Sequence, residues 1–406
     1  MPYDIEEAAQ TLSNNVEGFE TRTLQRIGAR IKKTGRLNSA DEQALQNLAN
    51  IGVDLDAIYA DLANVTLQNI ELSQRILIES MMSEMERSKA IFAAKGVPFI
   101  SYENNEFAQQ MVEHWAKETA GKMVNLSRTK AIGFTKTIPS GRTEFFARTV
   151  PGSRTEFTPI AGAFQQAIDS AVVAVRTGTT DFATAMRDTI TGLGGSGIIV
   201  NYGSGVTRRL DSMVRQNLLW GAKQSAQAYH NYIGRQFGAN GFEVDYHPHP
   251  RPSHAFMGGR IFSYGDEVTV EGVTYESGEE ALDRLDDYGC LHTALPVLLG
   301  ISQPRYDEEW LAEQKAKDEE IIEYITPDGK VIKGTRYEFT QRQNSLTRGI
   351  RESKREAIAL DAAGFKQFSK TANGRVKALR AAYDDLSEKT GLQPKKERMT
   401  VSGYRR

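Results

Sequence analysis

The sequence lacks several features that would place it in a familiar class of protein. It has one cysteine, Cys290, in 406 residues, so no disulfide can form within the chain. It has no run of about 18 apolar residues, which a membrane-spanning helix requires. Its first residues are acidic and no apolar segment follows them, unlike a secretory signal. We therefore expect synthesis in a reducing cytoplasm and no association with a membrane.

Charge is nearly balanced over the whole chain but is unevenly distributed near its end. The formal net charge is -2. Residues 307–323 contain eight acidic and two basic residues, whereas residues 336–406 contain 17 basic and eight acidic ones. The pattern is typical of an acidic exposed helix followed by an amphipathic basic one, and it also fits a basic arm that contacts nucleic acid. The side chains expected at such a non-specific contact are Arg342, Arg348, Arg351, Lys354 and Arg355.

The N-terminal part of the chain has the spacing of amphipathic helices. Leu24, Ile27 and Ile31 recur every three to four residues. A longer pattern over residues 66–95 should end before Pro98, because proline cannot continue a helix. Shorter helices are expected between these two. Further helical patterns cover residues 106–132, 164–190 and 208–237, and the last sixty residues form a basic helix or helical pair.

Two hairpin signals in the second half of the chain indicate short strands in place of helices. Apolar residues flank Glu271-Gly272 in one case and Pro327-Asp328-Gly329 in the other. We therefore predict a predominantly helical α+β fold. Its expected parts are a helical N-terminal region over 1–135, a hairpin, loop and helical connector over 136–205, a small α+β module over 206–335 and a basic helical tail over 336–406.

Most of the histidine residues and the single cysteine of the chain fall in one segment. Of six histidines and one cysteine, five lie between residues 247 and 292. Imidazole and thiolate are the usual ligands of zinc, which makes His247, His254, Cys290 and His292 candidate ligands of a structural ion. Two other interpretations stay open. The segment could be a hydrogen-bonded polar corner stiffened by its alternating prolines, or a thiol site in which His254 or His292 acts as a base for Cys290.

An ordered series of short motifs runs through the second half of the chain. The motifs are Tyr202-Gly203-Ser204-Gly205 with a following helix that bears Arg215, then His247 with Arg251-Pro252-Ser253-His254 and Gly259, then Cys290-Leu291-His292, then Tyr337–Gln343 and the basic helix after it. In this order they resemble the phage minor capsid protein 2 family, a relative of the phage head morphogenesis proteins. A weaker similarity continues through the N-terminal half.

The resemblance has two local departures. The family carries Gly-Ala before the arginine of the Arg-Pro-Ser-His motif, where this chain has His249-Pro250. The family has Asn before the cysteine and Arg after it, where this chain has Gly289 and Leu291. His249 has no family counterpart and is therefore left out of the expected zinc site.

What the resemblance implies is a structural role. Such a protein would be a low-copy component of the virion, assembled in the host cytoplasm near the portal, with the portal protein and other capsid proteins as partners. It would serve head morphogenesis, and genome packaging or ejection. Separately, the charge of the basic tail indicates a weak, non-specific contact with packaged DNA. The resemblance implies no enzymatic reaction, and no cofactor beyond the zinc ion of one interpretation above.

Two alternative functions use the same cluster. The first is a metal- or thiol-dependent enzyme built on His247, His254, Cys290 and His292, for which Asp266 or Asp287 would be the carboxylate base. The second is an effector that is carried in the head and delivered to the host with the DNA.

Overall fold

The computed structural model describes residues 5–34, 41–128, 132–138, 154–163, 166, 188, 191–193, 197–202, 207–287 and 289–404. Its longer helices are α1 (Ile5–Thr34), α2 (Asp41–Arg87), α4 (Glu106–Leu126), α7 (Leu210–Phe237), α9 (Glu308–Glu319), α10 (Arg336–Ala362) and α11 (Lys366–Thr390). Its short helices are α3 (Lys89–Ala94), α8 (Glu279–Leu285), η1 (Tyr102–Asn104), η2 (Pro252–His254) and η3 (Lys396–Met399). This predominantly helical α+β fold confirms the prediction.

The strands are short and form small antiparallel sheets. One sheet has the order β2-β1-β3-β4, a second has the order β6-β5-β9, and two are hairpins, β7-β8 and β10-β11. The first sheet consists of β1 (Ile132–Ile138), β2 (Arg154–Pro159), β3 (Ile199–Asn201) and β4 (Thr207–Arg209). The second consists of β5 (Gly241–Val244), β6 (Ile261–Ser263) and β9 (Ala294–Val297). The hairpins are β7 (Val268–Val270) with β8 (Val273–Tyr275), and β10 (Ile322–Ile325) with β11 (Val331–Gly334).

The α2 helix differs from the prediction in two ways: it is continuous in its first half, and it ends earlier than expected. It runs without interruption over 47 residues from Asp41, where several shorter helices were expected. Gly52 does not end it, because one glycine inside a helix costs only about 1 kcal/mol. The predicted helix over 66–95 is instead broken at Ser88, whose hydroxyl donates to the carbonyl of Met85 at 2.7 Å. The chain then re-enters a helix as α3 and turns at Gly96, which has a φ of 64°.

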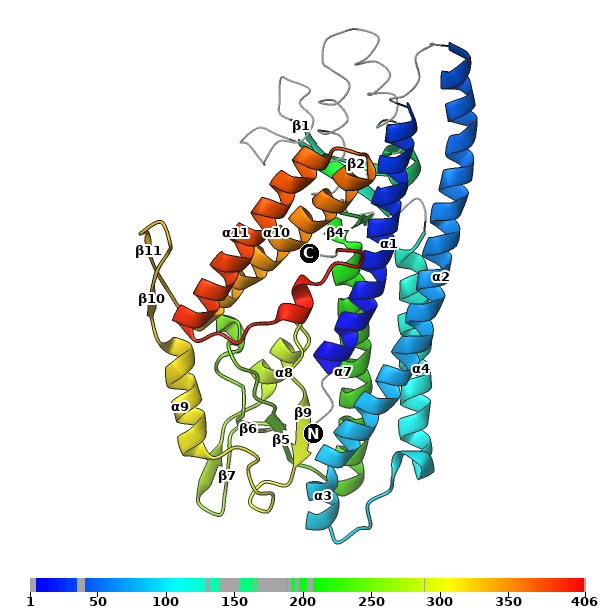
Figure 1. Ribbon diagram of the computed structural model, residues 1–406. Coiled ribbons are helices and arrows are strands. Elements are labelled where there is room, and N and C mark those ends of the chain that lie inside the picture. Colours follow the sequence, from blue (N-terminus) through cyan, green and yellow to red (C-terminus); the bar gives the residue numbers. More distant parts are fainter. Residues whose placement is uncertain are drawn as a thin grey trace.

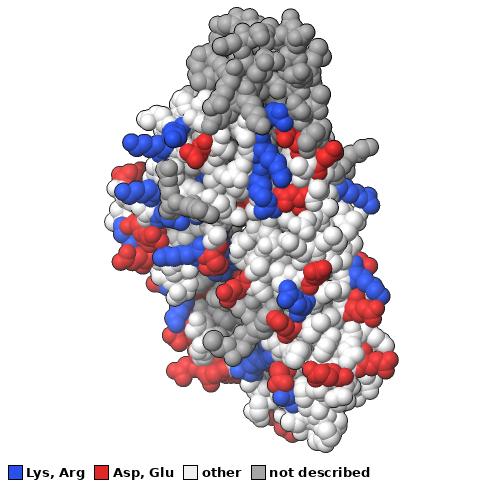
Figure 2. Space-filling view, turned by 45° about the vertical axis from the view of Figure 1, so that its right-hand side comes forward, with Lys and Arg blue, Asp and Glu red and all other residues white. Residues whose placement is uncertain are grey.

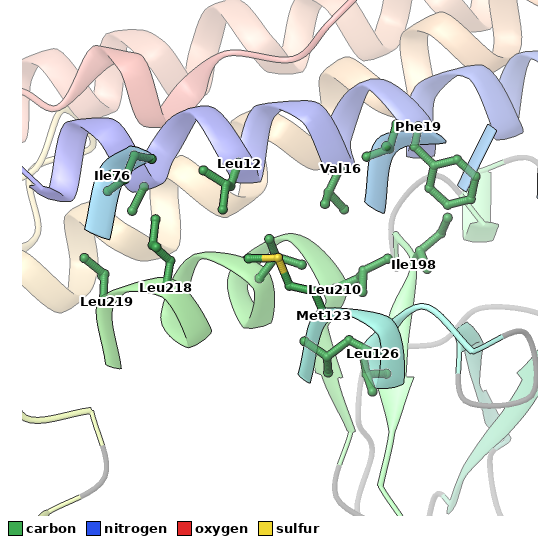
Figure 3. Packing of buried hydrophobic residues seen from close by; sticks show 14 of the residues in the cluster. Leu12, Val16, Phe19, Ile76, Met123, Leu126, Ile198, Leu210, Leu218 and Leu219 are labelled. Carbon is green, nitrogen blue, oxygen red and sulfur yellow. The ribbon is translucent and has the colours of Figure 1, made fainter. Parts of the chain in front are cut away.

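The main hydrophobic core lies where α1, α2, α4 and α7 pack along one another (Figure 1). Figure 3 shows Leu12 and Val16 of α1 directed towards α7, and Phe19 lies farther along α1 in the same core. Leu218 and Leu219 of α7 are buried on the opposite side of the same contact. This stack brings the first helix of the chain against the helix that carries the later motifs.

The predicted basic tail forms the antiparallel pair α10 and α11, which packs against α1 (Figure 1). A capping box starts α10: the backbone N–H of Thr335 donates to Glu338 Oε2 at 2.8 Å, and Glu338 N–H donates back to the Thr335 hydroxyl at 3.3 Å. Gly391 ends α11 with a φ of 68°. The expected helical pair is therefore confirmed, and its second helix ends at Gly391.

Three of the five side chains expected to contact nucleic acid are buried, which corrects that prediction. Arg351, Lys354 and Arg355 have exposed fractions of 9%, 3% and 0%. Arg355 Nη1 and Arg351 Nε lie 2.9 Å and 2.7 Å from Glu17 Oε1 of α1. An amphipathic basic helix must bury one face, and here carboxylates of distant helices pair with the cations on that face. Of the original set, Arg342 and Arg348 are exposed.

Both predicted hairpins are confirmed. Val268 pairs with Tyr275 across Glu271 and Gly272, which both have positive φ values as a tight turn of this type requires. Ile325 pairs with Val331 across the turn that contains Gly329, whose φ is 83°. The helix expected over 208–237 is α7, which ends at Gly238.

Other predictions fall wholly or largely outside the described residues. These are most of the helical pattern over 164–190 and much of the connector over 136–205. The four-part division of the chain also stays a prediction. The core contains residues from α1, α7 and α10, so it is shared across the boundaries at 205 and 335. None of the helices that the structure describes combines the length and the hydropathy needed to cross a bilayer.

Candidate functional site

A cavity of about 680 Å³ lies between α2, α7 and the loops that carry the histidine and cysteine cluster. His247, His254, Cys290 and His292 all line it. The start of α1 closes one side, where Ile5 and Glu6 contribute to the wall. The four residues named as candidate ligands therefore do meet at one place in the fold.

Three short elements hold these side chains. His254 ends the single turn of η2, where its N–H donates to the carbonyl of Arg251 at 2.8 Å. Cys290 follows α8, and its N–H donates to the carbonyl of Asp287 at 3.0 Å. His292 lies two residues before β9, whose strand Ala294–Val297 pairs with β5. Side chains from well-separated parts of the sequence thereby meet beside α7.

His254, Cys290 and His292 form the tightest group. One potential ligand atom from each lies within 4.8 Å of the other two, and all three side chains are buried. Cys290 Sγ lies 3.6 Å from His292 Nδ1. His254 Nε2 lies 2.9 Å from Asp287 Oδ2, so Asp287 fixes the orientation of the His254 ring.

His247 lies beside this group without joining it. Its ring packs edge-on against that of His292, with 4.6 Å between the ring centroids. Its Nε2 is 3.2 Å from Asp245 Oδ2, and the other Asp245 oxygen accepts the N–H of Thr293 at 2.7 Å. Burial favours a neutral His247, but the Asp245 carboxylate outweighs it and raises the pKa of His247. His247 is thus held by a carboxylate, apart from the other three.

The electrostatics favour neutral groups in the cluster. Burial, reinforced by neighbouring His247, lowers the pKa of His292 to about 3, so its ring is neutral at neutral pH. Burial raises the pKa of the Cys290 thiol, although the ammonium of Lys223 opposes this shift. Reactive cysteines have a lowered pKa and an accessible sulfur, whereas Cys290 is 2% exposed. These properties do not suit a thiol nucleophile.

One residue of the proline-rich segment departs from the extended geometry that is normal before a proline, whereas Arg251 keeps it. His249 has a φ of 55°, although the residue before a proline normally adopts an extended backbone. The reason is Asp318 of α9, whose Oδ1 lies 3.2 Å from the His249 backbone nitrogen and 3.1 Å from His249 Nδ1. This double contact holds both the backbone and the ring of His249 against α9.

The remaining motif residues pack within the fold, form an ion pair between helices or lie at the surface. Gly259 has a φ of 76°, and a Cβ at this position would lie 2.3 Å from a methyl carbon of Leu311. Arg215 Nη2 lies 3.2 Å from Glu6 Oε2 and so connects α7 to the start of α1. Pro252 and Ser253 are exposed in η2, beside the half-buried Arg251.

Nothing in the sequence pattern identifies two of the residues that lie at the site. Lys223 of α7 is 6% exposed, and its ammonium donates to the carbonyl of Leu285. Asp245 is 6% exposed and bonds both His247 and the segment that leads into β9. Both lie within an ordinary helical or strand pattern, so their roles depend on what packs against them. Of the candidate carboxylates, Asp287 contacts the cluster and Asp266 is exposed in the bend before β7.

Comparison with known proteins decides the family. A sequence model of the phage minor capsid protein 2 family matches residues 1–387, nearly the whole chain. The chain belongs to this family. Membership gives it a structural role in a phage capsid, a place in the virion and contacts with other phage head proteins. No curated protein and no solved structure matches the chain.

Proposed function

We propose that this chain is a low-copy head protein that is assembled near the portal and acts in head morphogenesis. The observation that carries the proposal is the family match over residues 1–387. A role in genome packaging or ejection would follow from the same position, because the DNA passes through the portal.

The surface of the helical body supports a role in assembly. Leu67 and Met82 of α2 and Val124 of α4 are large apolar side chains with exposed fractions of 61%, 41% and 51%. Scattered exposed apolar residues are common on soluble proteins. On long helices such residues also suit packing against helices of a partner, and the portal protein is the partner that we propose.

Mass spectrometry of purified phage particles tests the assembly role. We expect a few to a few tens of copies per particle, measured against the major capsid and portal proteins, together with cross-links from α2 or α4 to the portal protein. Absence from particles, with free protein in the infected cytoplasm, would contradict the proposal. A copy number equal to that of the major capsid protein would contradict the low-copy part.

The proposed contact with packaged DNA now depends on exposed residues of α10. Arg342 and Arg348 lie on the solvent side of that helix. On the face drawn in Figure 2, basic and acidic side chains are interspersed, so that face has no extended basic surface. Contacts of lysine and arginine with phosphates are non-specific and weaken steeply with salt. We therefore propose a weak, salt-dependent contact.

Charge reversal tests this contact better than deletion of the tail. Deleting residues 336–406 would remove Ile350 and Leu360 from the interior, because both are fully buried. We expect Arg342→Glu with Arg348→Glu to weaken binding to duplex DNA in a low-salt gel shift. The matched control is Lys117→Glu with Lys122→Glu on α4, which makes the same change in net charge. Equal binding by the two double variants would exclude α10 as the contact.

A further inference from the structure

The buried group beside α7 has the chemistry of a metal site, which the assembly role does not require. We propose that His254, Cys290 and His292 bind one Zn²⁺ ion, with a water molecule from the cavity as the fourth ligand. The inference is independent of where in the particle the protein sits.

The spacing of the side chains fits tetrahedral zinc. With Zn–S bonds of about 2.3 Å and Zn–N bonds of about 2.0–2.1 Å, a tetrahedron places sulfur and nitrogen about 3.5 Å apart. Cys290 Sγ and His292 Nδ1 are 3.6 Å apart. All three ligand atoms lie within 4.8 Å of one another, so small side-chain rotations complete the group. Thiolate and imidazole together select zinc over calcium and magnesium, which prefer oxygen ligands.

His292 gives a second, independent reason. It is 6% exposed, and its Nε2 has no hydrogen-bond partner among the residues that the structure describes. Its Nδ1 lies 3.6 Å from the sulfur of Cys290, which is at most a weak hydrogen-bond partner. A buried polar atom without a partner costs free energy. Coordination through Nδ1, the nitrogen 3.6 Å from the sulfur, would replace that weak contact with a bond to the metal, and Nε2 would then donate to water in the adjoining cavity.

Asp287 completes the arrangement of His254. When the proton of His254 is on Nε2, it is donated to Asp287 Oδ2 at 2.9 Å, and Nδ1 is left to coordinate the metal. A carboxylate behind a ligating histidine is a recurrent feature of zinc sites, because it fixes the tautomer and the ring orientation. The carboxylates of Asp286 and Asp245 also supply negative charge near the ammonium of Lys223, which lies beside Cys290.

His247 is excluded from the ligand set by its own partner. Its Nε2 already contacts Asp245 Oδ2 at 3.2 Å, and its side chain remains 40% exposed. Three protein ligands therefore leave one position open, and the adjoining cavity of about 680 Å³ gives water and the ion a route to it. The bound ion would fasten η2 to the segment before β9, so we expect it to stabilise this part of the fold.

Cobalt substitution gives a direct test on the full-length wild-type protein. Cys290 is the only cysteine of the chain, so any cobalt–thiolate charge-transfer band must come from it. We expect one equivalent of Co²⁺ to produce this band with the intense visible absorption of tetrahedral cobalt. One equivalent of Zn²⁺ should then remove both signals and raise the melting temperature. A folded protein that binds no stoichiometric Co²⁺ or Zn²⁺, or binds Co²⁺ without the thiolate band, would overturn the proposal.

Substitutions then test each assigned role. Cys290→Ser and His292→Ala should abolish stoichiometric zinc, whereas His247→Ala and the control His114→Ala, an exposed histidine of α4, should keep it. Asp287→Asn should weaken zinc affinity by about 10- to 100-fold. Loss of zinc in His247→Ala would overturn the three-ligand assignment, and wild-type affinity in folded Cys290→Ser would overturn the site. Circular dichroism checks the fold, and the wild-type cobalt spectrum decides the question if the variants do not fold.

Discussion

His230 is a fully buried histidine on α7, with an exposed fraction of 0%. Its Nε2 lies 3.6 Å from Glu84 Oε2 of α2. Burial, aided by the nearby cation of Arg305, lowers the pKa of His230 to about 4. Burial also raises the pKa of Glu84. Burial thus shifts both pKa values towards the neutral form, and the two shifts affect the pH dependence of stability in opposite directions.

We predict that His230 makes folding sensitive to mild acid. Between pH 6.5 and about 4 the unfolded histidine is protonated and the folded one is not, so the free energy of unfolding falls as the pH falls. The contribution is roughly 3 kcal/mol over this range. The Glu84→Gln variant lacks the opposing titration of Glu84. Its free energy of unfolding, measured in urea, should therefore fall as the pH falls from 6.5 to about 4. Adding His230→Gln should make the loss smaller by this amount, while His292, whose pKa is also lowered by burial, still contributes a loss of the same sign. Parallel curves for the two variants would contradict the prediction.

At the level of elements, glycines show where helices approach closely. Gly28 of α1 is buried, and a Cβ there would lie 2.8 Å from the carbonyl oxygen of Ala359 in α10. Gly121 of α4 is exposed, and a Cβ there would meet no atom within 4 Å. The two glycines have the same helical setting but opposite surroundings, so they separate helix propensity from packing.

We predict opposite effects of alanine at these two positions. Gly121→Ala should raise the free energy of unfolding by about 0.5–1 kcal/mol, because alanine is the better helix former. Gly28→Ala should lower it by about 1–3 kcal/mol, because α1 and α10 must move apart. Chemical denaturation of both variants measures this difference. Stabilisation by Gly28→Ala would mean that α1 and α10 do not pack as described.

The whole molecule is tied together by a buried network of charges. Glu17 of α1 accepts hydrogen bonds from Arg351 and Arg355 of α10, at 2.7 Å and 2.9 Å. Asp211 of α7 accepts from Arg351 at 2.5 Å and from Arg209 at 3.0 Å. Burial alone would raise the pKa of Asp211, but Arg209 and Arg351 hold it well below its usual value. The network links the beginning, the middle and the end of the chain.

We predict that Glu17→Ala destabilises the entire protein. It would leave two buried arginines without this carboxylate, a change that typically costs about 3–5 kcal/mol. A single cooperative transition at lower denaturant concentration, seen by both circular dichroism and tryptophan fluorescence, is the expected result. The control Glu113→Ala breaks the exposed pair with Lys117 and should leave the midpoint unchanged. Equal midpoints for both variants would show that the network does not hold the molecule together.

Local patterns were sufficient for much of the fold and for part of the site. The hairpin at Glu271-Gly272 and the helix end at Gly391 follow from backbone preferences of a few residues. The candidate ligands His254, Cys290 and His292 were identifiable because their side chains have few other uses in such a cluster. The separate position of His247 was not predictable, because it depends on the contact of this ring with Asp245.

The sequence by itself determined the helical character of the chain, its two hairpins, its motif series and the approximate location of the cluster. Only the tertiary structure decided which charges are buried and which are exposed. Arg348 and Arg351 lie three residues apart on one helix, yet the first is exposed and the second pairs with Glu17, 334 positions away. Short-range preferences act within a few residues, whereas the burial of a charge depends on partners that only the folded chain brings near.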